Sequence, residues 1–223
     1  MVYDELLLSS VLMLAVASYG QTTGVIEGTV KDGSGVPLVS ATVYARPQGV
    51  VLRAIVPHSS TDAQGRYSLQ LPFGRYSLAA GKPEKGYPDA LYATFYYGSK
   101  KRPEVVLSAR NNKATVNLRL GKKAGILVGT VTDASTGKPV NANVEFRWIS
   151  DPTIAISGSG LANAQFRILI PSATPLSMVV SQTGYENWVY LSKTQRGAIV
   201  LGPGEAMSLD IRLKPARPAA LSP

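Results

Sequence analysis

Serine, histidine and aspartate, the three residue types of a hydrolase triad, occur together at His58, Ser59, Ser60 and Asp62. A working triad brings its members together from separate elements, beside an oxyanion hole and a substrate pocket. Here the candidate residues all lie within one short segment with the composition of a turn, and His58 is the only histidine of the chain. The sequence therefore predicts no catalytic residues, and we expect no enzyme activity.

The chain also has few residues that could bind a metal ion or a cofactor. The chain has no cysteine and 1 histidine, so cysteine zinc sites, iron–sulfur clusters, thiolate nucleophiles and disulfides are excluded. No stretch has the acidic spacing of a calcium-binding loop, and Asp32, Asp62 and Asp133 are better explained as residues that form turns. We expect no metal site and no bound cofactor.

The elements around these residues come from one pattern that occurs twice, as IEGTVKDGSGVPLVSATVY at 26–44 and LVGTVTDASTGKPVNANVEF at 127–146. Within the first copy, Ile26, Gly28 and Val30 alternate with polar residues, which is the period of a strand buried on one face. Turn residues and a proline follow, and then a second alternating run begins. The repeat predicts an all-β chain of two tandem β-sandwich domains.

A second hairpin follows in the first copy. Asp62 and Gly65 are expected to form a structural turn, after which Tyr67, Leu69 and Leu71 share one face of a strand. The second copy has Leu161–Phe166 at this place and lacks both the Asp and the Gly, so its tight turn is doubtful.

These motifs carry a family resemblance. The order Gly-Thr-Val, Asp, Pro-Leu, Ala-x-Val, Thr-Asp-x-x-Gly-x-Tyr, Leu-Pro, Gly-x-Tyr between Gly28 and Tyr76 resembles the carboxypeptidase regulatory-like domain, a small transthyretin-like sandwich. The likeness extends over most of 24–120. It implies a seven-stranded Greek-key (Ig-like) sandwich without catalytic residues, of a kind that accompanies peptidases, outer-membrane receptors and surface proteins. We interpret the second copy as a diverged domain of the same type.

The expected organisation has four parts: a signal peptide at 1–20, the regulatory-like sandwich at 21–121, its diverged sister at 122–213 and a mobile proline-rich tail at 214–223. The N-terminal apolar run is too short to span a bilayer and has signal-peptide length, although Asp4 and Glu5 replace the usual basic residues. A misassigned start or a retained amphipathic strand are the alternatives. We expect a secreted, extracellular or periplasmic protein without a transmembrane span in the mature chain.

Positive charge is concentrated in the first copy. The net charge is +9, and residues 21–121 hold 13 Lys and Arg against 6 Asp and Glu, whereas 122–213 hold 8 against 6. The cluster Lys100, Lys101 and Arg102 is a candidate basic patch that would attract an acidic polysaccharide or lipid headgroups. Solvated loop charge is the simpler alternative. No aromatic-interleaved basic motif points to nucleic acid.

Aromatic residues offer the other candidate surface. Tyr92, Tyr96 and Trp188 carry flat rings that could stack on sugars or anchor a protein partner, unless they fill the sandwich cores.

The functional expectation is a non-enzymatic, exported protein that acts in adhesion, scaffolding or assembly at a bacterial cell envelope. One alternative is a carbohydrate-binding module that uses the exposed Tyr and Trp, and another is an accessory domain of a peptidase or outer-membrane receptor system. The expected partner is a protein or an envelope polysaccharide, and self-association through edge strands is a further expectation.

Overall fold

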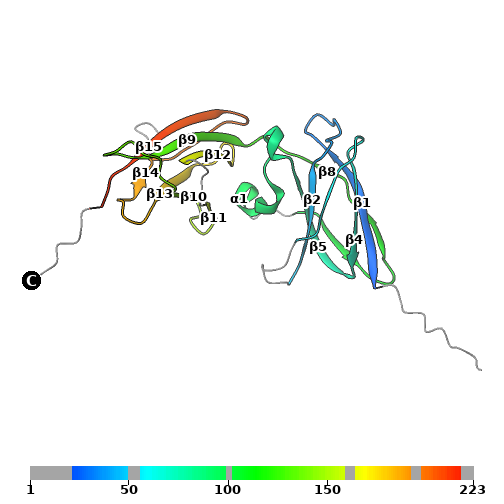
Figure 1. Cartoon of the computed structure of the whole chain (residues 1–223). Helices are drawn as coiled ribbons and strands as arrows, with labels where there is room; N and C mark the ends of the chain where they lie inside the picture. Colours follow the sequence, from blue (N-terminus) through cyan, green and yellow to red (C-terminus); the bar gives the residue numbers. More distant parts are fainter. Residues whose placement is uncertain (1–21, 50–55, 99–101, 159–163, 192–196, 217–223) are drawn as a thin grey trace, which may run out of the picture.

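A computed structural model describes residues 22–49, 56–98, 102–158, 164–191 and 197–216, and it is all-β apart from short helical turns. The strands form two groups, called here the first module (up to Gly121) and the second module (from Lys122), and Figure 1 shows them side by side in an elongated molecule. The start of β1 and the end of β15 lie at opposite ends of this arrangement.

Two sheets make up the first module. Its elements are β1 (Thr23–Lys31), β2 (Thr42–Pro47), β3 (His58–Ser60), β4 (Arg66–Pro72), β5 (Gly74–Gly81), the 3-10 helices η1 (Pro83–Lys85) and η2 (Ala90–Tyr92), α1 (Ala93–Tyr97), β6 (Glu104–Leu107), β7 (Lys113–Thr115) and β8 (Leu118–Arg119). One sheet has the order β4-β1-β7, with β8 also on β1, and the other has the order β3-β2-β5-β6. β1 pairs antiparallel with β4 and parallel with β7 and β8.

The second module repeats these pairings. Its strands are β9 (Gly125–Asp133), β10 (Asn143–Trp148), β11 (Ala155–Gly158), β12 (Gln165–Ile170), β13 (Leu176–Ser181), β14 (Trp188–Val189) and β15 (Ala206–Leu213). The sheet orders are β12-β9-β15 and β11-β10-β13-β14, and β9 again has an antiparallel and a parallel neighbour. Each strand therefore has a counterpart in the first module with the same neighbours. That this module is a diverged member of the same family stays a proposal.

Each module has its own apolar core between its two sheets. The predicted alternation is confirmed in both, because Ile26 and Val30 are fully buried in β1 and Val144 and Phe146 are buried in β10. A strand whose alternate side chains enter the core has the other set in water, which is the pattern of β4, where exposed and buried residues alternate along the strand.

The repeated glycine of the two copies has a steric reason. A Cβ atom added to Gly28 would lie 1.9 Å from the carbonyl oxygen of Val116, and one added to Gly129 would lie 1.9 Å from that of Leu209. In both modules the backbone of the closing segment passes directly against the first strand at this glycine. The glycine allows the two backbones to approach, as glycine within a strand often does.

The closing strand of the first module is interrupted. It is divided into β7 and β8 because Asn117 lies between them and its side chain replaces a backbone partner: the Asn117 Oδ1 atom accepts from the Thr29 backbone N–H (3.0 Å) and from its hydroxyl (2.9 Å). β15, its counterpart, is continuous.

The C-terminal boundary also differs from the prediction. Lys214–Ala216 were expected to begin a mobile tail, but the Ala216 N–H donates to Gly184 O (2.9 Å) and the Glu186 N–H to Lys214 O (2.8 Å). These residues continue the fold of the second module. The expected signal peptide at 1–20 and the rest of the tail lie outside the described residues.

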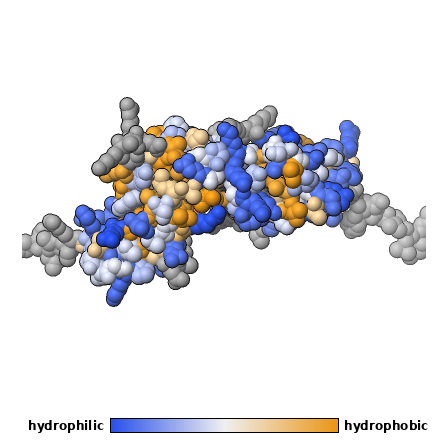
Figure 2. All heavy atoms as spheres, turned by 90° about the horizontal axis from the view of Figure 1, so that it is seen from above, coloured by the Kyte–Doolittle hydropathy of each residue, from blue (hydrophilic) through white to orange (hydrophobic). Residues whose placement is uncertain are grey.

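Seen from above, hydrophobic surface gathers on the second module, while the first module is mostly hydrophilic on this face (Figure 2). The exposed large apolar residues of the second module are Ile149, Val189 and Leu191. Within the described part of the chain, no helix has the length and apolar character needed to cross a membrane.

Candidate binding site at the joint between the modules

The segment between β5 and β6 leaves the first sandwich and packs against the second. It contains η2, whose first turn is capped by the Asp89 carboxylate accepting from the Leu91 N–H (2.9 Å), and the five-residue α1. Phe95 in α1 is 4% exposed, and the side chains that bury it belong to the core of the second module. Figure 1 shows α1 between the two modules. The first module thus contributes a residue to the second core.

Two hydrogen bonds hold this helix in place. The Trp148 indole Nε1–H donates to Phe95 O (2.8 Å), and the Tyr96 hydroxyl donates to Leu169 O (2.9 Å). Burial raises the pKa of Tyr96 well above its ordinary value, and the nearby Asp89 charge adds to this shift. The Trp148 ring lies so close to Gly98 that an added Cβ atom would be 3.0 Å from it. The indole therefore packs directly on the backbone that ends α1.

The connection between the modules is fixed as well. Ala124 is 1% exposed, its N–H donates to Gly86 O of the first module (2.8 Å), and its carbonyl accepts from the Gly204 N–H of the second (3.0 Å). We call the contacts of Phe95, Tyr96, Trp148 and Ala124 the joint. The connection is exposed at 121–123, but at Ala124 the chain is buried and bonded to both modules.

A pocket of about 380 Å³ opens beside the joint and receives side chains from both modules. Its lining residues are Arg46, Leu91, Tyr92, Thr94, Phe95, Arg102, Ala155 and Ile156. Arg46 points outward from β2, where its Nη2 donates to Leu91 O (3.0 Å), and Arg102 donates through Nη2 to Thr94 Oγ1 (2.7 Å). We call this the arginine pocket.

The two guanidinium groups of the arginine pocket are only partly satisfied. The Arg102 Nε atom is buried and has no hydrogen-bond partner. Burial lowers the pKa of Arg102, and the like charge of Arg46 lowers it further, which agrees with their closeness. Among the described residues, neither arginine forms an ion pair with a carboxylate. A buried donor without a partner is costly, so an acceptor that entered this pocket would be stabilised.

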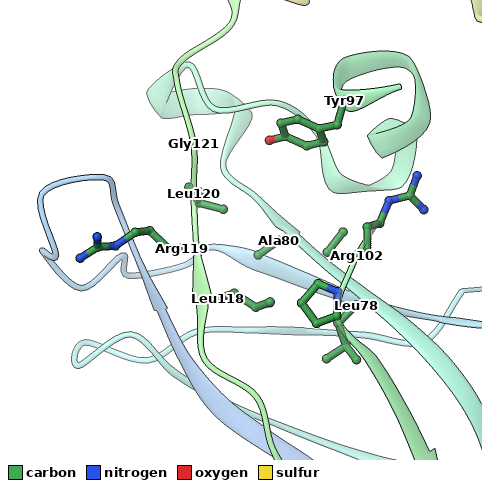
Figure 3. Close-up of a pocket in the computed structure, with 10 residues that line it drawn as sticks. Leu78, Ala80, Tyr97, Arg102, Leu118, Arg119, Leu120 and Gly121 are labelled. Carbon is green, nitrogen blue, oxygen red and sulfur yellow. The ribbon is translucent and has the colours of Figure 1, made fainter. Parts of the chain in front are cut away.

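Arg102 also borders a second hollow, of about 270 Å³, which is lined largely by apolar residues of the first module, among them Leu78, Ala80, Leu118 and Leu120. In Figure 3 the Tyr97 ring lies over this hollow, and the Arg102 guanidinium points away from it. Arg102 therefore presents its stem to the apolar hollow and its charge to the arginine pocket, as long basic side chains commonly do.

The three aromatic residues predicted to form a binding surface lie in different environments. Tyr92 is 48% exposed and lines the arginine pocket. Tyr96 is held in the joint by its bond to Leu169. Trp188 is half-buried on β14, next to Tyr190 with ring centroids 6.3 Å apart, at the opposite edge of the sheet from β11. They form no common surface.

Of the predicted basic patch, Arg102 lies in the arginine pocket, while Lys100 and Lys101 lie outside the described residues. Asp62 and Gly65 form a turn: the Asp62 carboxylate accepts from the N–H groups of Gln64 (2.9 Å) and Arg66 (2.8 Å), and Gly65 has φ +72°. These bonds lower the pKa of Asp62, with the Arg66 N–H as the main cause.

The single histidine also has local contacts. The His58 Nδ1 atom lies 3.2 Å from Val56 O, and the ring packs against Tyr44 with centroids 5.4 Å apart. In the part of the chain that the structure describes, no group of three His, Asp or Glu residues is placed to hold a metal ion.

The sequence did not indicate Arg46 as a site residue, and it marked Phe95 only as one of a run of aromatic residues, not as part of the second core. Arg46 alternates with buried residues of β2 and has the pattern of an ordinary outward-facing side chain. Phe95 lies among Tyr92, Tyr96 and Tyr97, and a run of consecutive aromatic residues has no period that distinguishes a core residue from a surface one. The density of aromatic residues between 92 and 97 was the one sequence feature that could have indicated a buried contact in this segment.

Comparison with solved structures finds distant likenesses. The Bacillus anthracis TIE protein is 18% identical with a TM-score of 0.34, and the match covers 87% of this chain and 34% of that one, so the chain spans about a third of its length. The shaft pilin SpaA of Lactobacillus rhamnosus GG is 13% identical with a TM-score of 0.38, covering 89% of this chain and 100% of the pilin. A streptococcal ancillary pilin is 15% identical with a TM-score of 0.34, covering 89% and 64%.

At such identities and TM-scores, these likenesses carry no argument about function. No curated protein sequence matches the chain. The family comparison is more specific: the model of the carboxypeptidase regulatory-like domain matches residues 25–121. This range is the first module, which carries the Gly-Thr-Val strand, the Asp62 turn and the closing strands described above. The chain therefore contains a carboxypeptidase regulatory-like domain at residues 25–121.

Proposed function

We propose that the chain is a non-enzymatic structural protein of the cell exterior, in which two β-sandwiches act as one rigid unit in adhesion, scaffolding or assembly with a protein partner. The observation that carries this proposal is the joint, in which Phe95 of the first module is buried in the second module's core. A protein that holds partners at a fixed distance needs such a connection, because a flexible linker would allow a wide range of distances between them.

Two further features support a spacer role. The described ends of the chain lie at opposite ends of the elongated pair, so an attachment at each end would be separated by both modules (Figure 1). The match of residues 25–121 to the carboxypeptidase regulatory-like domain supports a non-catalytic role. An exported location is part of the proposal, and it is supported by the signal-peptide length of the N-terminal apolar run.

Small-angle X-ray scattering tests the rigid unit. The intact chain is compared with a joint variant, Phe95→Ala with Tyr96→Ala, at a temperature where tryptophan fluorescence shows the second module still folded. We expect the intact chain to scatter as one elongated particle and the variant to show the larger radius of gyration and the signature of flexibly linked modules. Identical profiles would contradict the proposal. Fractionation of cells that make the native chain tests the location, and recovery from the cytoplasm alone would refute it.

A further inference from the structure

We propose that the arginine pocket is the binding site for a carboxylate on an extended segment of a protein partner. This inference rests on the proposed function, because it gives the chemistry of the partner that the rigid unit would hold.

The charge of the pocket selects the ligand. Arg46 and Arg102 have no carboxylate partner among the described residues, and the Arg102 Nε donor is buried and unpaired. The Asp89 carboxylate at the start of η2 accepts from the Leu91 N–H and, among the described residues, forms no ion pair with either arginine, so the positive charge of the two guanidinium groups is not neutralised by a paired carboxylate. A planar carboxylate can accept two parallel N–H bonds from a guanidinium, and the unpaired Arg102 Nε–H can supply one of them.

The walls of the pocket favour a side chain rather than a hydrated inorganic ion. Leu91 and Phe95 of the first module and Ile156 of the second give it an apolar lining, and the exposed Tyr92 ring lies at the same site. The methylene groups of a glutamate side chain would be buried against these residues while the carboxylate reaches the guanidinium groups.

An extended backbone is favoured by the strand at the pocket's edge. β11 is the end strand of its sheet, and it pairs only with β10 among the strands described. The Trp148 N–H donates to Ile154 O, so by the antiparallel alternation Ile156 also bonds toward β10. The amide and carbonyl groups of Ala155 and Ser157 consequently point away from β10. A partner strand could bond there, as in other cases of strand addition.

A nuclear magnetic resonance titration tests the site in the full chain. The probe is the capped peptide acetyl-Val-Thr-Glu-Val-Thr-amide, and its matched control has Gln in place of Glu. We expect the Glu peptide to shift the Arg102 Nε–Hε resonance together with the amide resonances of Ala155 and Ser157, and to bind at least about tenfold more tightly than the Gln peptide. Equal binding of the two peptides would overturn the proposal.

Substitutions locate the site. Arg46→Gln and Arg102→Gln should each weaken the Glu peptide at least about tenfold, and Arg102→Lys should weaken it too because it keeps the charge but loses the planar donor edge. Arg212→Gln removes the same charge from an exposed position on β15 and should change affinity less than about twofold. Unchanged affinity in all of the pocket variants, with their folding verified by tryptophan fluorescence, would refute the site.

Competition distinguishes the source of the anion. Inorganic phosphate and polygalacturonate are titrated in parallel, and either one shifting the Arg102 resonance at lower concentration than the Glu peptide would overturn the assignment to a protein segment. This outcome is independent of the scattering test, because a rigid joint does not require an occupied pocket, and an occupied pocket does not require a rigid joint.

Discussion

Replacing Phe95 with alanine should destabilise the second module, although Phe95 belongs to the first module in the sequence. The residue lies in α1 of the first module, yet its 4% exposed ring packs among side chains of the second core. Truncation of a buried phenylalanine to alanine typically costs about 3–5 kcal/mol, from lost apolar burial and the cavity that remains. With a urea m-value of about 1–3 kcal/mol/M, the unfolding midpoint of the second module should fall by at least about 1 M.

The chain is suited to this measurement because both of its tryptophans, Trp148 and Trp188, lie in the second module. Urea unfolding monitored by tryptophan fluorescence therefore reports that module together with the joint, where Trp148 contacts Phe95 and Gly98. The matched control is Tyr92→Ala, which removes a ring from the same segment but at a position that is 48% exposed. It should cost no more than about 1 kcal/mol. A Phe95→Ala midpoint equal to that of the control would refute the reasoning, since Phe95 would then contribute nothing to the second core.

Three further predictions concern the modules themselves. Gly28→Ala and Gly129→Ala should each lower the free energy of unfolding in urea by about 2 kcal/mol or more, because the new methyl group would lie 1.9 Å from a carbonyl oxygen. Gly158→Ala is the control and should be near neutral, since its new methyl group meets nothing within 4 Å. Equal effects of the three substitutions would contradict this prediction. Ala173→Gly should raise the free energy of unfolding by up to about 1 kcal/mol, because Ala173 is exposed and has φ +54°, a backbone conformation that glycine adopts without strain. Ala155→Gly, in a regular strand, should lower it. If both substitutions lowered the stability, the backbone at Ala173 would not be strained. Hydrogen bonds from the Thr136 N–H, the Tyr185 hydroxyl and the Ser135 N–H lower the pKa of Asp133 to about 2. Because this folded-state pKa lies below the ordinary 3.8, the ionised Asp133 stabilises the fold above about pH 4, and this stabilisation is lost as the pH falls toward 2. Asp133→Asn should flatten the tryptophan-monitored stability profile in that window, and an unchanged slope would count against the assignment.

The fold could be predicted largely because its signals are local. Alternation identified the buried faces of β1, β4 and β10, and the repeat of Gly28 at Gly129 identified two modules with the same pairing order. The doubtful turn of the second copy illustrates a limit of such reasoning. Ala164, which precedes β12 as Gly65 precedes β4, has φ +58°, so the left-handed backbone is kept without the glycine that usually marks it. Residues 159–163 before it are outside the described part of the chain.

The joint and the arginine pocket could not be predicted, for a physical reason. Phe95 is buried by residues that are distant in sequence, and no neighbouring pattern records which module will cover it. Arg46 and Arg102 lie on separate elements and come together only when the η2–α1 segment folds back over β2. The sequence did indicate Arg102 and Tyr92 as candidates, from charge and aromatic density, but it could not show that both belong to one pocket.

The most direct test of the central claim, that the two sandwiches form one rigid unit, is a distance distribution between spin labels in solution. The absence of cysteine allows labels at Ser68→Cys on β4 and Arg167→Cys on β12, two exposed and equivalent positions of the two modules. Pulsed electron paramagnetic resonance should give a single narrow distribution that broadens when Phe95 and Tyr96 are both replaced by alanine. A broad distribution in the otherwise unaltered chain, no narrower than that of the joint variant, would contradict the account.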